Sequence, residues 1–289
     1  MNRYIQKLIK EQFNIDDIDF SDDDQEYDAN IFNKTIDIDI NKIYDNLLSW
    51  KITKNEIYQL NDLTSIIMPK NRKELISIIN FYSIYYPTCS LNWLDVSKIT
   101  NMSHLFDKSK YNGDISKWDV SNVKDMTSMF CESYFDNDIS KWDVSKVKTM
   151  ALMFYKSTFH GDISNWNVSK VKTMNCMFLY SFFNSDISKW NVHNVTDMFR
   201  MFESTPFNQN ISKWNVHNVT NMSYMFQHTP FNQDISDWDV SKVTNMFEMF
   251  SWSPFNQDIS KWNVDNVKYY KDIFYHCSIK EEYKPLKFR

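Results

Sequence analysis

The stretch Ile211–Asp234 reads ISKWNVHNVTNMSYMFQHTPFNQD, and its apolar spacing decides the predicted fold. Trp214 and Val216 alternate with polar residues, which is the period of a strand with one buried face. The apolar residues that follow fall at i, i+3, i+6 and i+7, namely Val219, Met222, Met225 and Phe226. That spacing predicts a short helix with one apolar face.

The last third of the stretch carries turn residues. Thr229–Asp234 contains Pro230, Asn232 and the apolar Phe231, which we expect to plug the core. The chain has only 2 Gly, so few positions can use glycine for a left-handed backbone. Because asparagine tolerates that conformation, we expect residues such as Asn232 to replace glycine at the turns.

The same pattern repeats along most of the chain. Tryptophan recurs every 24 residues at Trp118, Trp142, Trp166, Trp190, Trp214, Trp238 and Trp262. Eight units fit between Leu91 and Glu282 without an insertion. A strand, a helix and a turn in so few residues are typical of leucine-rich repeats. The sequence therefore predicts an α/β repeat solenoid of eight strand-helix-turn units, stabilised by contacts between neighbouring units.

The repeat pattern D-I-S-K-W-D-V-S-x-V-x-x-M-x-x-M-F-x-x-x-x-F-N resembles the BspA-like bacterial repeat family. That family occurs in surface proteins of mycoplasmas, spirochaetes and gut bacteria. The resemblance covers Leu91 to Glu282 and implies a leucine-rich-repeat-like solenoid in proteins that adhere to host or matrix proteins. It brings no catalytic residues.

Four regions are expected: an acidic, partly disordered segment at 1–30, a helical region with a cap at 31–90, the solenoid at 91–282 and a tail at 283–289. Asp16–Asp28 contains eight acidic residues and no basic one, which favours a solvated linker. An acidic docking segment for a basic partner is the alternative. Asn71 and Glu74 form a capping-box pattern before an apolar run that ends at Pro87, which predicts the helix of the cap.

The outward positions of the expected strands form polar columns that a protein partner could contact. The candidate binding residues are Lys141, Lys189, Asn191, His193, Lys213, Asn215, His217 and Asp239. The alternative is that these columns only keep one face of the sheet hydrated and paired.

No metal site is expected from the sequence. His193 and His217 occupy one column in adjacent units, but two histidines without a third ligand make a weak site. A further column of Asp residues, which includes Asp186 and Asp234, is expected to accept backbone N–H bonds at the turns. The four cysteines have no metal-binding or disulfide-framework spacing and are expected to be free and buried.

Composition excludes several classes of function. The two glycines lie in no phosphate-binding or nucleophile motif, so we expect no cofactor and no enzymatic activity. A net charge of −5 argues against non-specific nucleic-acid binding. We expect a protein-binding solenoid for recognition or adhesion, or alternatively an intracellular or virion-associated scaffold. The sequence shows no signal peptide and no membrane span, which predicts a cytoplasmic or virion-associated protein, or one displayed at the surface by a non-classical route.

Overall fold

A computed structural model describes residues 68–69 and 71–289. The chain divides into two compact units, Met1–Ile67 and Met68–Arg289. The predictions made for residues 1–30, and for the first part of the region 31–90, lie outside the described residues. In the described part, the elements are one α-helix, α4 (Arg72–Tyr85), and two short 3-10 helices, η4 (Glu281–Tyr283) and η5 (Leu286–Phe288).

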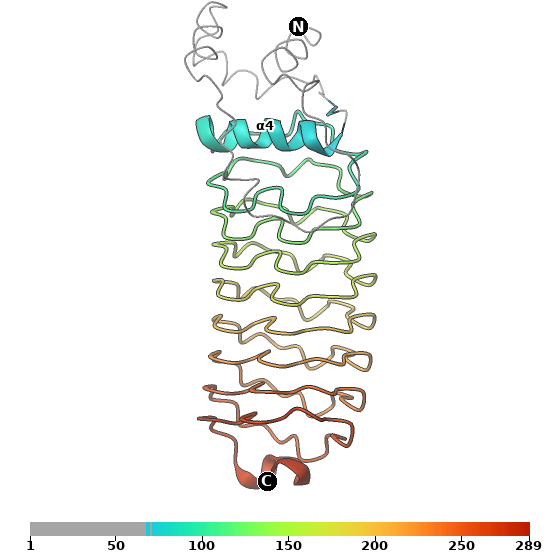
Figure 1. Ribbon diagram of the computed structural model, residues 1–289, viewed down its shortest axis with the longest axis vertical. Coiled ribbons are helices and arrows are strands. Elements are labelled where there is room, and N and C mark those ends of the chain that lie inside the picture. Colours follow the sequence, from blue (N-terminus) through green and yellow to red (C-terminus); the bar gives the residue numbers. More distant parts are fainter. Residues whose placement is uncertain (1–67, 70) are drawn as a thin grey trace, which may run out of the picture. The chain divides into compact units, whose positions relative to one another are not determined.

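Helix α4 forms where the capping pattern predicts a helix. The side chain of Asn71 accepts the backbone N–H of Glu74 at 3.0 Å, which caps the first turn. The last turn ends with the N–H of Tyr86 bonded to the carbonyl of Tyr82, directly before Pro87. The buried residues of the helix are Glu74, Leu75, Ile78 and Ile79. The helix lies across the end of the stack next to the first repeat (Figure 1).

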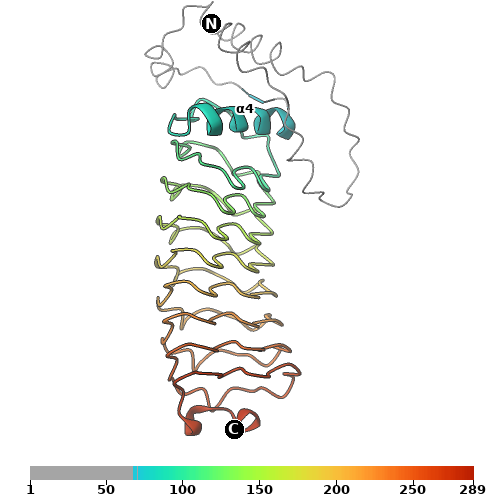
Figure 2. The same cartoon turned by 60° about the vertical axis from the view of Figure 1, so that its left-hand side comes forward.

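The eight repeats form coils of chain that stack along one axis of this unit (Figures 1 and 2). We number them coil 1 (91–114) to coil 8 (259–282), each 24 residues long. One residue of each coil forms a parallel β-bridge with its equivalent in the next coil. The series is Asn101, Asp125, Thr149, Thr173, Asp197, Asn221, Asn245 and Tyr269. Among the described residues no extended strand accompanies these isolated bridges. The 24-residue period is therefore real, but it builds no extended sheet.

The predicted strand is wrong. In coil 6 the N–H of Trp214 bonds to the carbonyl of Ile211 at 3.0 Å, and the N–H of Val219 bonds to that of Val216 at 2.9 Å. Both bonds close tight turns. The side chains alternate between core and solvent, as those of a strand do. The backbone N–H groups of Trp214 and Val219, however, bond within the same coil, whereas in a strand they would bond to a neighbouring strand.

The predicted helix is wrong as well. The N–H groups of Met222, Tyr224, Phe226 and His228 donate to carbonyls of coil 7, at 2.9, 2.9, 2.9 and 3.0 Å. The residues between them close i→i−3 turns, and Tyr224 and His228 have φ of 60° and 53°, which no α-helix contains. An α/β strand-helix solenoid is thus contradicted, because bonds between coils take the groups that a helix would pair internally.

The expectation for glycine and asparagine is also wrong. All sixteen described residues in the left-handed region are non-glycine, none of them is Asn, and each coil has two. Asn232 is not one of them, and neither glycine has a positive φ. Gly113 is needed for close approach instead, since a Cβ there would lie 2.0 Å from the carbonyl oxygen of Cys89. Bonds and ring contacts between coils offset the left-handed strain.

The core consists of side-chain columns that run through the stack. The largest is the phenylalanine column Phe106, Phe130, Phe154, Phe178, Phe202, Phe226, Phe250 and Phe274. Neighbouring rings lie 5.3–5.9 Å apart and within 15° of parallel. In coils 2 to 7 each ring thus buries its faces against the coils on both sides, which no single coil could do alone.

The tryptophan column adds a bond between every pair of neighbouring coils. Each indole Nε1–H donates to a carbonyl 27 residues earlier, as Trp190 does to Ile163 at 3.0 Å and Trp214 to Ile187 at 3.1 Å. The same bond occurs at Trp118, Trp142, Trp166, Trp238 and Trp262. The indole therefore satisfies its own buried polar group and ties two coils together.

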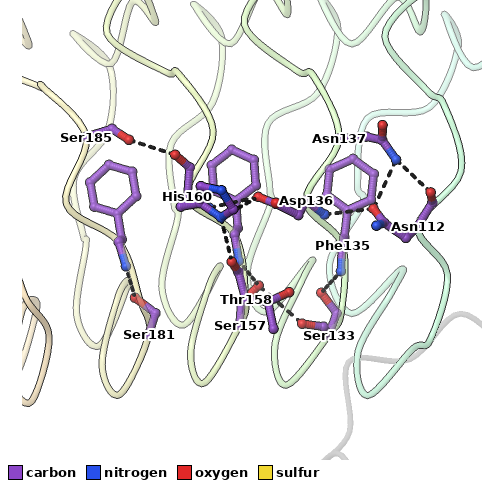
Figure 3. Close-up of polar contacts among 12 residues, drawn as sticks. Asn112, Ser133, Phe135, Asp136, Asn137, Ser157, Thr158, His160, Ser181 and Ser185 are labelled. Atoms are coloured by element: carbon purple, nitrogen blue, oxygen red, sulfur yellow. Dashed lines mark hydrogen bonds and ion pairs between the residues drawn. The ribbon is translucent and has the colours of Figure 1, made fainter.

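A ladder of side-chain amides and carboxylates runs along the stack at the positions equivalent to Asn232 of coil 6. Figure 3 shows its first members: Asn112 Oδ1 accepts the N–H of Asp136 at 2.9 Å, and Asp136 Oδ1 accepts that of His160 at 3.0 Å. His160 has no such oxygen, and instead Ser185 Oγ donates to the His160 carbonyl at 2.8 Å. The ladder resumes at Asn184, whose Oδ1 accepts the N–H of Asn208 at 3.0 Å.

Candidate interaction face

The structure places the predicted binding columns on the surface, but it gives their amides and carboxylates an internal role. The Oδ1 atoms of Asn191, Asn215 and Asp239 accept the backbone N–H two residues further on, at 3.3, 3.2 and 3.0 Å. Such bonds stabilise Asx turns. Of the predicted set, Lys141, Lys189 and Lys213 are exposed and not used in this way.

The two histidines of that set do not face a common ligand. His217 Nδ1 lies 2.6 Å from Asp239 Oδ2, whereas His193 Nδ1 lies 2.8 Å from Asn191 Oδ1. Bonds from Ser241, and then from His217, lower the pKa of Asp239 to about 2. No group of three or more His, Cys, Asp or Glu among the described residues could hold a metal ion.

The second Asp column behaves as predicted. Its members accept the N–H of the serine two residues later, at 2.8 Å for Asp186 and 2.9 Å for Asp234. The same bond occurs at Asp114, Asp138, Asp162, Asn210 and Asp258. These bonds lower the pKa of Asp138, Asp162, Asp186, Asp234 and Asp258. The column stabilises the turns.

A different set of positions carries side chains that change from coil to coil. They are equivalent to residues 223, 224, 227 and 228 of coil 6, which include the two left-handed positions, 224 and 228. In coils 4 to 8 we call them the variable face and define it by Tyr180, Phe199, Arg200, Glu203, Tyr224, Gln227, His228, Phe247, Glu248, Trp252, Tyr275 and His276. The repeating core does not dictate these residues, so this face gives each coil its own chemistry.

Arg200 lies at the centre of the variable face. Its guanidinium is 4.3 Å from the ring centroid of Tyr224 and 5.2 Å from that of Phe199. Nη1 lies 3.2 Å from Glu203 Oε2. The Glu203 side chain is only 4% exposed, and this burial raises the pKa of the carboxyl group against the opposing effect of Arg200. The hydroxyl of Tyr180 bonds to Glu203 Oε1 at 3.4 Å. These contacts join coils 4, 5 and 6.

Trp252 marks the other end of the variable face. The residue is 49% exposed, and its ring lies 4.1 Å from that of His276 and 5.7 Å from that of His228. Two further exposed aromatics, Tyr134 (60%) and Phe182 (70%), belong to the neighbouring column that continues as Pro206, Pro230 and Pro254. Exposed Trp, Tyr and Arg are the residues that dominate the energetics of protein interfaces.

The cysteines give no sign of a reactive thiol. Cys89, Cys131 and Cys176 are free and buried, and Cys277 is free and half-buried. Burial raises the pKa of Cys131 to about 12 and that of Cys176 to about 11, so both are thiols at neutral pH.

The variable face was not predicted from the sequence, because the prediction rested on polar residues that recur every 24 positions. Variation was the signal: when the eight units are compared position by position, Arg200, Tyr224, Glu248 and Asp272 follow one another in one column. Residues that differ while the surrounding columns stay constant are free of the core's demands.

The chain belongs to the family described as Mycoplasma protein of unknown function, DUF285. The family model matches three overlapping stretches, residues 81–182, 135–230 and 179–284, which together span more than half of the sequence. This is a repeat protein, and its family has no assigned function. No curated protein and no solved structure matches the chain. Within the described residues, no helix has the length and apolar character to cross a membrane.

Proposed function

We propose that this protein is a non-enzymatic, protein-binding repeat that contacts its partner through the variable face. The observation that carries the proposal is that half-buried Arg200 and the exposed Tyr180 and Trp252 lie on coils whose other positions repeat. Rigid elements present such side chains at little ordering cost.

A role in recognition or adhesion is the finer part of the proposal. It is supported by the resemblance of the repeat pattern to BspA-like surface proteins. The second candidate is a scaffold inside the cell or in a virion. The free cysteines favour it, because free thiols are typical of reducing compartments. Fractionation of the native source separates the two, since recovery only inside cells or particles would rule out adhesion.

The binding test compares two double variants of the full chain. Tyr180→Ser with Trp252→Ser removes exposed aromatic area from the variable face. Lys141→Asn with Lys213→Asn is the matched control, because Asn165 already occupies that column. Quantitative affinity capture from the native source should lose specific proteins with the aromatic pair and keep them with the lysine pair. Equal capture by the wild type and the aromatic pair, with folding intact by circular dichroism, would contradict the proposal.

A further inference from the structure

The last coil exposes a row of backbone donors that every earlier coil pairs. In coil 7 the N–H groups of Met246, Glu248, Phe250 and Trp252 donate to carbonyls of coil 8, at 2.7, 3.2, 3.0 and 2.8 Å. The equivalent donors of coil 8 are the N–H groups of Tyr270, Asp272, Phe274 and His276. Among the described residues none of these four has a hydrogen-bond acceptor. We call residues 269–276 the C-terminal edge.

The C-terminal edge offers donors only. Its carbonyls at Tyr269, Lys271, Ile273 and Tyr275 already accept the N–H groups of coil 7. A second copy of the same edge would therefore meet it donor against donor. Head-to-tail stacking is blocked too, because α4 lies across coil 1 and Arg72 donates to the carbonyl of Ser103 there (Figure 1). Neither arrangement of a second copy therefore supplies the acceptors.

The C-terminal tail bonds to backbone carbonyls at this end of the stack, but to none of the four free N–H groups. Lys287 Nζ donates to the carbonyls of Val264, Asp265 and Val267 at 3.1, 3.0 and 2.8 Å. Lys287 therefore occupies one group of carbonyls at the end of the stack. The carbonyls of Lys268 and Cys277, equivalent to those of Thr244 and Ser253 that accept from coil 8, have no donor among the described residues. Unpaired backbone groups at such an end are a template for another chain.

Charge at the C-terminal edge favours an acidic partner. The peptide units of the donor columns align through the stack, as they do in a helix, so the unpaired N–H groups carry a partial positive charge. Lys268 and Lys271 are exposed beside them. Lys271 Nζ forms an ion pair at 3.8 Å with Asp272 of the edge itself, whereas Lys268 has no ion pair among the described residues. Tyr269 (63% exposed) and Tyr275 (51%) add accessible ring surface.

We propose that the C-terminal edge binds an acidic segment of a partner protein. The carbonyls of that segment accept the four free N–H groups, as those of coil 8 accept the N–H groups of coil 7, and its carboxylates lie near Lys268 and Lys271. The C-terminal edge shares Tyr275 and His276 with the variable face but includes neither Arg200 nor Tyr180, and the proposal does not depend on the function suggested for that face.

Amide hydrogen exchange of the full chain tests the edge directly. The probe is an acetylated, amidated peptide of eight residues that alternates Glu and Thr. In the free protein the amides of Tyr270, Asp272, Phe274 and His276 should exchange rapidly. Peptide at ten times its Kd should slow them about tenfold. The paired amides of Met246, Glu248, Phe250 and Trp252 are the internal control and should not change. Slow exchange at all four edge amides in the free protein would mean that another part of the chain occupies the edge, and would overturn the proposal.

Two further comparisons test the chemistry of the partner. Lys268→Glu with Lys271→Glu should weaken peptide binding about tenfold at low salt, the size expected of two exposed charge pairs. Lys141→Glu with Lys189→Glu adds the same negative charge elsewhere and should not weaken it. A peptide that alternates Gln and Thr should bind less tightly than the Glu peptide. Equal binding of both peptides, or no protection of the edge amides by either, overturns the proposal.

Discussion

The repeated columns and the variable face lie on the same coils but obey different constraints. Phe202 and Trp190 are buried between neighbouring coils, where each residue must match the one 24 positions before and after it. Arg200 and Tyr224 sit a few residues away on the same backbone and are half-buried. Packing between identical units restricts which residue type a buried position can hold, whereas a partly exposed position can hold many types. The predictions below test how sharp that division is.

The largest effect is expected in the phenylalanine column. Phe202→Ala removes a ring stacked 5.7 Å from Phe178 and 5.9 Å from Phe226, and should lower the free energy of unfolding by about 3–5 kcal/mol. Tyr224→Ala, in the variable face, should cost only about 1 kcal/mol, mainly its contact with Arg200. Urea denaturation of both variants measures the difference. Equal losses would show that the variable face is part of the core.

The tryptophan column should show the next largest effect. Trp190→Phe keeps an aromatic ring but removes the indole bond to the Ile163 carbonyl, which then accepts only the N–H of Trp166 at 3.1 Å; this should cost about 0.5–1.5 kcal/mol. Trp252→Phe is the control from the variable face. Its indole N–H has no acceptor among the described residues, so the change should stay within about 0.5 kcal/mol. A thermal or urea transition that is the same for both variants would argue against the indole bond as a tie between coils.

Acid should weaken the turns of the repeated columns. Bonds from backbone and serine groups lower the folded-state pKa of Asp162, Asp186 and Asp234, and that of Asp239 to about 2. Because an unfolded Asp has a pKa of about 3.9, the carboxylates stabilise the fold above that pH. This contribution is lost as the pH falls from about 4 towards about 2.

The matched variant for the acid prediction already exists within the chain. Asn210 takes the place of Asp in coil 5 and accepts the same bond at 2.9 Å. Replacing Asp162, Asp186 and Asp234 by Asn should therefore reduce the drop in melting temperature between pH 4 and pH 2. The melting temperature of both proteins, followed across that range, gives the comparison. A drop of the same size in the variant would remove these turns as its cause.

The smallest effect concerns the left-handed residues. Ser204 has φ of 55°, a conformation that costs a non-glycine residue about 1–2 kcal/mol. Ser204→Gly relieves that strain, which should offset the extra freedom of glycine in the unfolded chain and leave stability unchanged or slightly higher. Ser212→Gly, at a position without positive φ, should lose about 0.5–1 kcal/mol. Equal losses in urea denaturation would mean that the left-handed turns carry no strain.

The period and the buried residues could be predicted from the sequence, but the backbone could not. Trp214 and Val216 point inward as expected, because any path that alternates inside and outside produces that pattern. Buried and exposed side chains alternate in a series of tight turns as they do in a strand. The two differ in hydrogen bonding: the N–H of Val219 bonds to Val216 in the same coil and not to a neighbouring strand. Similarly, Met222 and Phe226 are buried as helical spacing predicts, although Tyr224 between them is left-handed. Short apolar patterns constrain burial more than hydrogen bonding.

The candidate site could be predicted only in part. The polar columns that contain Asn191, Asn215 and Asp239 lie on the surface as expected, but Asx bonds to their own backbone occupy them. A periodic pattern cannot separate a residue that serves the fold from one that serves a partner. Arg200 and Trp252 escaped notice because each occurs once in its column.

The interrupted amide ladder at His160 bears on how the stack yields to mechanical load. On either side of it, Oδ1 atoms such as those of Asp136 and Asn184 join one coil to the next, while coils 3 and 4 share the weaker substitute from Ser185 (Figure 3). If the two ends of the stack were pulled apart, we expect the first rupture between these coils. Coils 1 to 3 and coils 4 to 8 would then separate as two blocks, and the contact between coils 3 and 4 would be the first to yield under load.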